Sequence, residues 1–350
     1  MAYMTDMPVE LLFCIAAFAP RADVLTLMRT CRYFLRAYAV ELYSTVDVKG
    51  MRGRLLALSI LTSKILDYGN LINRFTFRGE ESSDHLYLTY PLVVDALTCM
   101  NRLTKITIIM STSHAHYFTS VMRKQGLFRT SETALASVHL ALSEDPPFSR
   151  YNLPHLEEIV VDGDPDMLRL AMNRRITRLT CRSCLNSGTL ADVLSWTNGG
   201  LLLSLSIKLF VSTSTELVMI MYGISESCPN IQHLEIATGM FNALDVSFAL
   251  SSNPVIFPKA RSIWLNQRYL LPPVHGSPVN ETYNIQLHHL EKASESMPFL
   301  TNVKFGVVDW TLHYGISGTR WRSEYFRKEI WEGPQWLNFK GDFSCMFLKE

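Results

Sequence analysis

Residues 156–181 read LEEIVVDGDPDMLRLAMNRRITRLTC and contain one apolar pattern twice. In each copy, an apolar residue is followed by two variable residues, a second apolar residue, one variable residue and a third apolar residue. The copies are Leu156/Ile159/Val161 and Ile176/Leu179/Cys181. The last two apolar positions alternate with a single other residue, which is the periodicity of a β-strand with one buried face. The stretch therefore predicts two strands of this kind.

The same pattern recurs on both sides of this stretch. On the amino-terminal side it occurs at Ile72/Phe75/Phe77, Leu103/Ile106/Ile108 and Leu135/Val138/Leu140. On the carboxy-terminal side it occurs at Leu202/Leu205/Ile207, Ile231/Leu234/Ile236, Ala260/Ile263/Leu265 and Leu300/Val303/Phe305, with a degraded copy at Pro334/Leu337/Phe339. Most of the central copies follow one another at intervals of about 20–29 residues, the range of leucine-rich repeats, while the first and last intervals are longer.

One residue lies between the two inward-facing residues of each copy, and strand alternation turns it to the opposite face. These residues are Thr76, Thr107, His139, Val160, Thr180, Ser206, Glu235, Trp264, Lys304 and Asn338, and eight of the ten are polar or charged. We therefore expect a sheet with one packed face and one face open to solvent or a partner. Trp264 is the exception in size, so we predict that Trp264, with Glu235 and Lys304, belongs to a substrate-binding surface.

Helix-like stretches at residues 190–194, 215–224 and 285–293 separate some of the predicted strands. Repeated strand and helix predict an α/β solenoid over residues 49–350, in which each unit is buried by its neighbours. This half resembles the irregular leucine-rich repeats that follow F-boxes in many fungal proteins, although it lacks a regular asparagine after the strand. Another α/β arrangement of similar strands is the alternative.

The first fifty residues have helical periodicity instead. Pro8 and Glu10 suit the start of a helix, Leu11, Ile15 and Phe18 recur on one stripe with Leu12 and Ala16 alongside, and Pro20 ends the helix. Asp23 is the expected N-cap of a second helix, with Leu27, Cys31, Phe34, Leu35 and Tyr38 on one face, and residues 39–43 form a third segment. A unit of roughly forty residues cannot cover both faces of such helices, so leftover apolar surface is expected to meet a partner or the next domain.

The order and spacing of Met7-Pro8-Val9-Glu10-Leu11-Leu12, Ile15, Asp23-Val24-Leu25, Leu27, Cys31-Arg32 and Phe34 resemble the F-box. The resemblance implies a three-helix module over residues 1–48 that binds a Skp-type adaptor and, through it, a cullin-based ubiquitin ligase. The positions that it implies for adaptor binding are Met7, Pro8, Leu11, Leu12, Ile15, Val24, Leu25, Leu27, Cys31 and Phe34. Met7 stands where the family usually has leucine. The alternative is the first helical hairpin of a larger helical core.

Composition argues against several partners and compartments. The net charge is +1 and no block of like charges occurs, so no general attraction to nucleic acid is expected. The amino terminus lacks the basic region of a signal peptide, and the longest later apolar run, residues 201–210, has half the length of a membrane helix. Seven cysteines, an odd number without a regular spacing, fit reduced thiols, so we expect a cytoplasmic or nuclear protein that binds no membrane.

No metal, cofactor or catalytic motif is complete. Cys181 and Cys184 form half of a zinc or redox motif without a second pair, and His114, His116, His288 and His289 lack a ligand spacing. Phosphate-binding glycine loops, nucleophile elbows and kinase signatures are absent from the sequence, and Gly315-Ile316-Ser317-Gly318 lacks the spacing of a hydrolase turn. We therefore expect a non-catalytic protein without cofactors, and keep an enzyme with scattered residues as a third possibility.

The last fifty residues are rich in tryptophan, with Trp310, Trp321, Trp331 and Trp336 close to several arginines. Such a composition fits either a binding hot spot or a cap over residues 306–350 that closes the solenoid. The resemblance to F-box proteins with repeats implies a substrate-recognition subunit of a Skp–cullin–F-box ligase that captures an unknown protein substrate. The alternative is an interaction scaffold that recruits no ligase.

Overall fold

The computed structural model describes residues 7–79, 86–128, 152–211, 213–238, 250, 257–267, 279–305, 308–315 and 318–323. By their internal contacts the residues form two units, Met1–Lys208 and Leu209–Glu350. Two predicted copies of the repeat pattern, Leu135/Val138/Leu140 and Pro334/Leu337/Phe339, lie outside the described residues, together with Trp331 and Trp336.

Three helices begin the first unit: α1 (Val9–Phe18), α2 (Arg21–Thr30) and α3 (Arg32–Tyr43). The predicted N-cap at Asp23 is wrong, because Pro20 precedes the helix and Asp23 lies in its first turn. The expected second helix, which should have run through Tyr38, is divided at Cys31, whose backbone is extended (φ −157°, ψ 162°). The Thr30 hydroxyl donates a hydrogen bond to the Leu27 carbonyl. Such side-chain bonds to the backbone compete with the helical hydrogen bonds that would continue α2. Residues 39–43 are the last turn of α3.

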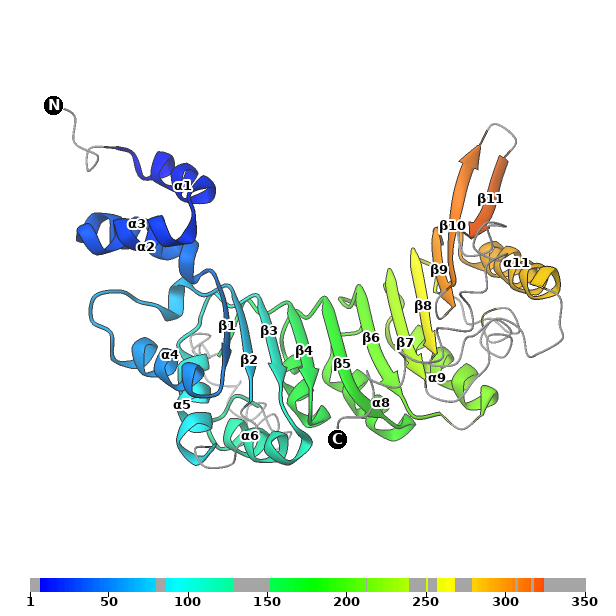
Figure 1. Cartoon of the computed structure of the whole chain (residues 1–350). Helices are drawn as coiled ribbons and strands as arrows, with labels where there is room; N and C mark the ends of the chain where they lie inside the picture. Colours follow the sequence, from blue (N-terminus) through cyan, green and yellow to red (C-terminus); the bar gives the residue numbers. More distant parts are fainter. Residues whose placement is uncertain are drawn as a thin grey trace, which may run out of the picture. The chain divides into compact units, whose positions relative to one another are not determined.

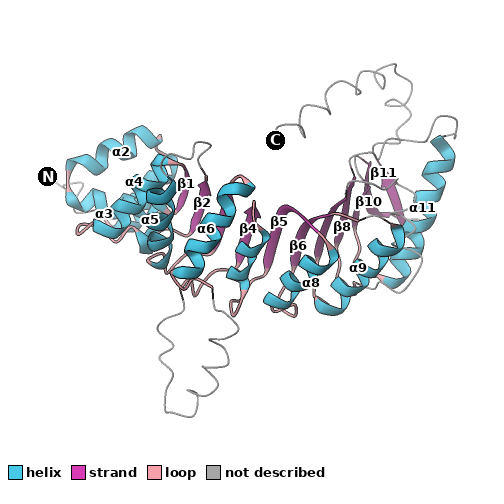
Figure 2. Ribbon diagram, turned by 90° about the horizontal axis from the view of Figure 1, so that it is seen from below, coloured by secondary structure: helices cyan, strands magenta, loops and turns pink. Residues whose placement is uncertain are grey.

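Strands and helices alternate after α3. The elements are β1 (Thr45–Lys49), α4 (Met51–Thr62), the short helix η2 (Gly69–Leu71), β2 (Arg74–Arg78), α5 (Leu86–Thr98), β3 (Lys105–Ile109), α6 (Thr112–Lys124), β4 (Glu158–Asp162), the short helix η5 (Pro165–Ala171), β5 (Arg178–Leu185), α8 (Ser187–Trp196) and β6 (Ser204–Leu209). Strands β1 to β5 pair in chain order and in parallel. In Figures 1 and 2, α4, α5, α6 and α8 lie on one face of this sheet. No copy of the repeat pattern was assigned to β1, which straddles the expected boundary between residues 48 and 49.

The second unit continues the alternation with α9 (Ser214–Ser227), β7 (His233–Thr238), β8 (Ser262–Gln267), α11 (Val279–Ser296) and β9 (Asn302–Phe305). Strands β7, β8 and β9 are parallel, whereas β10 (Val308–Gly315) and β11 (Gly318–Ser323) follow in antiparallel order. The α/β class and the helices predicted at residues 190–194, 215–224 and 285–293 are thus confirmed. Even α11, the longest described helix at 18 residues, lacks the length and apolar character needed to cross a bilayer, as do the other described helices.

The residues of the repeat pattern form the sheet's side of the core. In all eight copies that the structure describes, each of the three apolar residues is 2% exposed or less. The strand register aligns these residues into ladders: Phe75, Ile106, Ile159 and Leu179 are successive partners in the first unit, as are Leu234, Ile263 and Val303 in the second. Each strand therefore places its two inward side chains against those of the next.

Aromatic rings attach the helices of the first unit to its sheet. Phe77 of β2 contacts Tyr90 of α5 and Phe118 of α6 at ring-centroid distances of 5.8 Å each. Helix α4 approaches the same ring so closely that a Cβ atom at Gly53 would lie 2.6 Å from it. Glycine at position 53 is therefore a packing requirement of the α4–β2 contact.

Candidate functional site

The three amino-terminal helices share a small core of their own. Its fully or nearly fully buried members are Leu12, Ala16, Val24, Met28, Phe34, Ala37, Tyr38 and Ala39. The Tyr33 hydroxyl donates a hydrogen bond of 2.6 Å to the Met7 carbonyl, which ties the start of α1 to α3. Leu66 and Leu71, from the segment between α4 and β2, pack against this core from outside, so the module is joined to the rest of the first unit by apolar contacts.

Helix α1 presents a second apolar stripe to solvent. Leu11 is 52% exposed, Ile15 36% and Phe18 91%, and their spacing of four and three residues places them on one side of the helix. On α2, Leu25 is 40% exposed. Large apolar side chains at such exposure are usual when isolated, whereas a stripe of three on one helix forms a contiguous apolar patch of the kind that marks interaction surfaces.

The ten predicted adaptor-binding residues divide into three groups. Pro8, Leu11, Ile15 and Leu25 are exposed, Met7, Leu27 and Cys31 are half-buried, and Leu12, Val24 and Phe34 are buried in the module's core. The buried three can support a docking surface but cannot touch a partner. Phe18 was not among the ten, although its position seven residues after Leu11 placed it on the same stripe.

A second surface lies on the sheet of the second unit, on the face opposite the core residues. The register makes Glu235 the partner of Trp264, and Trp264 the partner of Lys304, so the three predicted substrate-binding residues are neighbours in one row. Lys304 Nζ lies 5.7 Å from the centroid of the Trp264 ring, a cation–π contact. Asp309 of β10 is the next partner in the row.

The Trp264 ring is held by residues that the sequence pattern did not single out. Its Nε1–H donates to Asn302 Oδ1 at 2.7 Å, and Asn302 Nδ2 donates to Asp309 Oδ1 at 2.7 Å. Trp264 nevertheless remains 40% exposed. An oriented, half-exposed indole is the kind of side chain that anchors a protein interface.

The other two described tryptophans near the carboxy-terminal end are structural. Trp310 is fully buried and its Nε1–H donates to Gln286 Oε1 of α11 at 2.8 Å. Trp321 is 5% exposed and donates to Ser294 Oγ of the same helix at 2.9 Å. Trp310 and Trp321 therefore pack β10 and β11 against α11. Neither side chain is exposed enough to serve as a binding hot spot.

The Cys181–Cys184 pair has the properties of separate thiols. Cys181 is an inward strand residue, and burial raises the pKa of its thiol from 9.0 to about 11, so that it stays protonated at neutral pH. Cys184 is exposed and is not bonded to Cys181. Within the described part of the chain, no group of three or more histidine, cysteine, aspartate or glutamate side chains is arranged to hold a metal ion.

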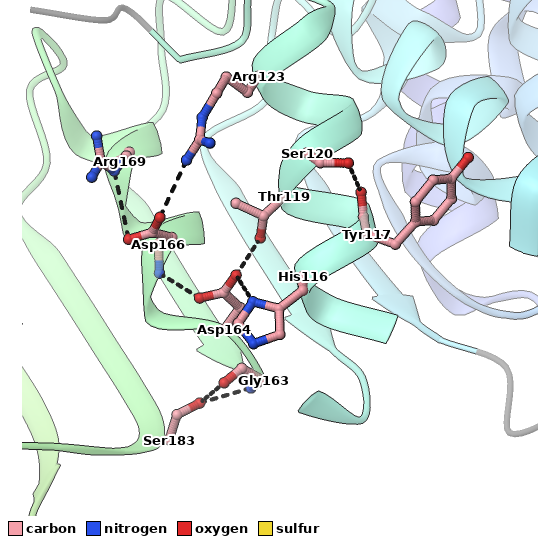
Figure 3. A network of polar contacts seen from close by, with 10 residues as sticks. All are labelled: His116, Tyr117, Thr119, Ser120, Arg123, Gly163, Asp164, Asp166, Arg169 and Ser183. Atoms are coloured by element: carbon pink, nitrogen blue, oxygen red, sulfur yellow. Dashed lines mark hydrogen bonds and ion pairs between the residues drawn. The ribbon is translucent and has the colours of Figure 1, made fainter. Parts of the chain in front are cut away.

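The two histidines of α6 have different surroundings. The His114 ring is half-buried and lies 6.3 Å from that of Tyr90. His116 is exposed, but its Nδ1 lies 3.1 Å from Asp164 Oδ2, which also accepts from Thr119 Oγ1 at 2.9 Å. Asp164 Oδ1 accepts from the Asp166 amide at 3.0 Å, at the start of η5. Figure 3 shows that Asp164 thereby joins α6 to the segment that follows β4.

We expect Asp164→Ala to lower the free energy of unfolding by roughly 2–4 kcal/mol, because a buried, charged acceptor of several hydrogen bonds is lost and Thr119 is left unpaired. Asp166→Ala is the matched control, since its contacts with Arg123 at 3.3 Å and Arg169 at 3.6 Å are partly exposed ion pairs. Its cost should stay below about 1 kcal/mol. Chemical denaturation of the two variants compares them, and equal costs would contradict the role given to Asp164.

A cavity of the first unit lies beside the loops before β5 and β6. It has a volume of about 800 Å³ and is lined by Trp196, Arg174, Arg175 and neighbouring residues of the loops before β5 and β6. No carboxylate, histidine or cysteine lines it. The Arg174 guanidinium donates to the carbonyls of Leu127 and Asn152, so this residue serves to hold the loops together.

Comparison with known proteins assigns no family. No protein-family model matches the chain, and no curated protein is significantly similar to it. Among solved structures, a protein of Bacteroides fragilis from a structural genomics consortium aligns over 71% of this chain and 69% of its own, with 11% identity and a TM-score of 0.35. A likeness this weak carries no inference about function.

Proposed function

We propose that the chain is a substrate-recognition subunit of a Skp–cullin–F-box ubiquitin ligase. In this proposal α1–α3 are the F-box, which binds a Skp-type adaptor. The strands and helices that follow are an irregular leucine-rich-repeat domain that holds a target protein. The observation that carries the proposal is the exposed stripe of Leu11, Ile15 and Phe18 on a module whose own core lies on the other side of the same helix.

The open face of the strands in each unit supports the second half of the proposal. Every described copy of the repeat directs its apolar residues to the helix-covered side, so the opposite side is available to a partner. In the second unit this side carries the row of Glu235, Trp264 and Lys304. The chain would supply proximity and not chemistry: a target held here and an adaptor bound to α1 make ubiquitin transfer effectively intramolecular.

Adaptor binding is tested with the full chain and a purified Skp-type adaptor. We expect Leu11→Asp/Ile15→Asp to weaken capture at least about 100-fold, since each apolar side chain contributes about 1.5 kcal/mol or more when buried at an interface. Leu12 is unsuitable for this test because it is fully buried in the module.

The matched control is Leu55→Asp/Met219→Asp, which places two carboxylates at apolar positions of α4 and α9 that are 59% and 64% exposed. This variant should bind the adaptor like the natural chain. Unchanged capture by the Leu11/Ile15 variant would contradict the proposal. Capture of the adaptor without recruitment of a cullin would favour the scaffold alternative instead.

A further inference from the structure

The open face of strands β1–β6 is basic. Alternation and burial assign to it seven basic and three acidic side chains: Lys49, Arg74, Arg78, Lys105, Arg178, Arg182 and Lys208, against Asp47, Glu158 and Asp162. This is an excess of four positive charges, whereas the whole chain has a net charge of +1. Positive charge is therefore concentrated on the face opposite α4, α5, α6 and α8 (Figure 2).

The charges are arranged in two rows with a small-residue row between them. The register aligns Arg74, Lys105, Glu158 and Arg178 at the amino ends of the strands, and Lys49, Arg78, Ile109 and Asp162 at the carboxyl ends. Between these rows lie Thr76, Thr107, Val160 and Thr180, and the row ends on β1 with Asp47, which is paired with Arg78. With about 3.3 Å per residue, the two charged rows are about 13 Å apart.

Ion pairs within the face neutralise only some of its basic side chains. Arg78 Nη2 lies 2.9 Å from Asp47, and Glu158 is shared by Lys105 at 2.6 Å and Arg178 at 3.9 Å. Arg74 and Arg182 are exposed and lie outside these three ion pairs, one in each charged row. Basic side chains thus remain on both sides of the middle row.

We propose that this face binds an extended acidic segment of a partner protein, which lies across the strands along the row of Thr76, Thr107, Val160 and Thr180. An extended polypeptide places alternate side chains about 7 Å apart on its two edges, so glutamate or aspartate on both edges can reach the two basic rows. The short side chains of the middle row leave room for its backbone. This inference rests on the proposed function and adds the chemical class of the captured protein.

The side chains of the face favour a polypeptide over nucleic acid. Single-stranded nucleic acid is held by aromatic side chains on which bases stack, and the outward positions of β1–β6 carry none. Duplex binding depends on neutralisation of phosphates by cations, whereas Glu158 and Asp162 lie within the charged rows and Asp47 lies between them. A peptide can avoid these three positions by its sequence.

The test is a fluorescence-anisotropy titration of the full chain with a labelled 12-residue peptide of three Glu-Glu-Ser-Ser repeats, which in extended form carries glutamates on both edges. We expect binding that weakens as salt is raised from 50 to 300 mM, because exposed charges are screened. Arg74→Gln/Arg182→Gln should bind the peptide roughly fivefold more weakly. A control, Arg102→Gln/Lys124→Gln, removes two exposed positive charges outside the strands and should bind like the natural chain.

Three results would overturn the inference: no binding of the peptide at low salt, equal weakening by the two double variants, or tighter binding of a single-stranded RNA of equal charge. The last would reassign the face to nucleic acid. The test needs no adaptor, and the Leu11→Asp/Ile15→Asp chain should bind the peptide normally. Loss of adaptor capture and loss of peptide binding are therefore separate outcomes.

Discussion

Replacing Leu12 by alanine is expected to unfold the three-helix module while the sheet stays folded. Leu12 is fully buried at the centre of a core of eight residues. Truncation of a buried leucine costs about 2–5 kcal/mol, which is comparable to the whole stability that so small a core provides. Hydrogen exchange measured peptide by peptide should show loss of protection in α1–α3 and unchanged protection in β2–β5.

The neighbouring residue provides the control for this experiment. Leu11 precedes Leu12 in the same helix but is 52% exposed, so Leu11→Ala should change the free energy of unfolding by less than about 0.5 kcal/mol. It should still weaken adaptor binding if α1 is the docking helix. Equal loss of protection in both variants would mean that the core of the module is not the one described.

Trp310→Ala is expected to destabilise β9–β11 and α11 by about 3–5 kcal/mol. The substitution opens a cavity at a fully buried site and leaves Gln286 Oε1, on a residue only 2% exposed, without its donor. Thermal unfolding together with hydrogen exchange of α11 measures the effect.

Trp264→Ala is the matched control, because it removes the same side chain from a half-exposed position of the same unit. Its expected cost is about 1 kcal/mol, for the contact with Lys304 and the hydrogen bond to Asn302. A cost as large as that of Trp310→Ala would show that Trp264 holds the sheet together and is not available to a partner.

The strands of the core could be predicted because the inward residues of every described copy are buried, and burial requires apolar residues at regular positions in the sequence. Strand β1 was missed although Tyr43, Val46 and Val48 have the spacing of the pattern, because residues 1–48 had been assigned to the helical module. The change to antiparallel pairing after β9 was also missed. Gly315 and Gly318, which the register pairs across β10 and β11, were considered only as a possible hydrolase turn.

Helix α1 shows why the docking surface could be predicted only in part. It is apolar nearly all round, so sequence periodicity cannot tell which of its two stripes, Leu12 with Ala16 or Leu11 with Ile15 and Phe18, faces the core. That choice depends on how α2 and α3 pack. On the sheet, strand alternation did predict that Trp264 and its two neighbours share a face, whereas its hydrogen bond to Asn302 depends on side-chain geometry.

Within each unit, the strands pair in the order in which they occur in the chain. Each strand and its helix contact only their neighbours in the chain. Gain or loss of one such unit in evolution would therefore leave the other pairings intact, because the two strands that become neighbours both present apolar residues on the same face. The spacing of basic side chains along the open face would change in steps of one strand, about 4.8 Å. Families of such chains could thus tune the length of the segment that they accept without redesigning a core.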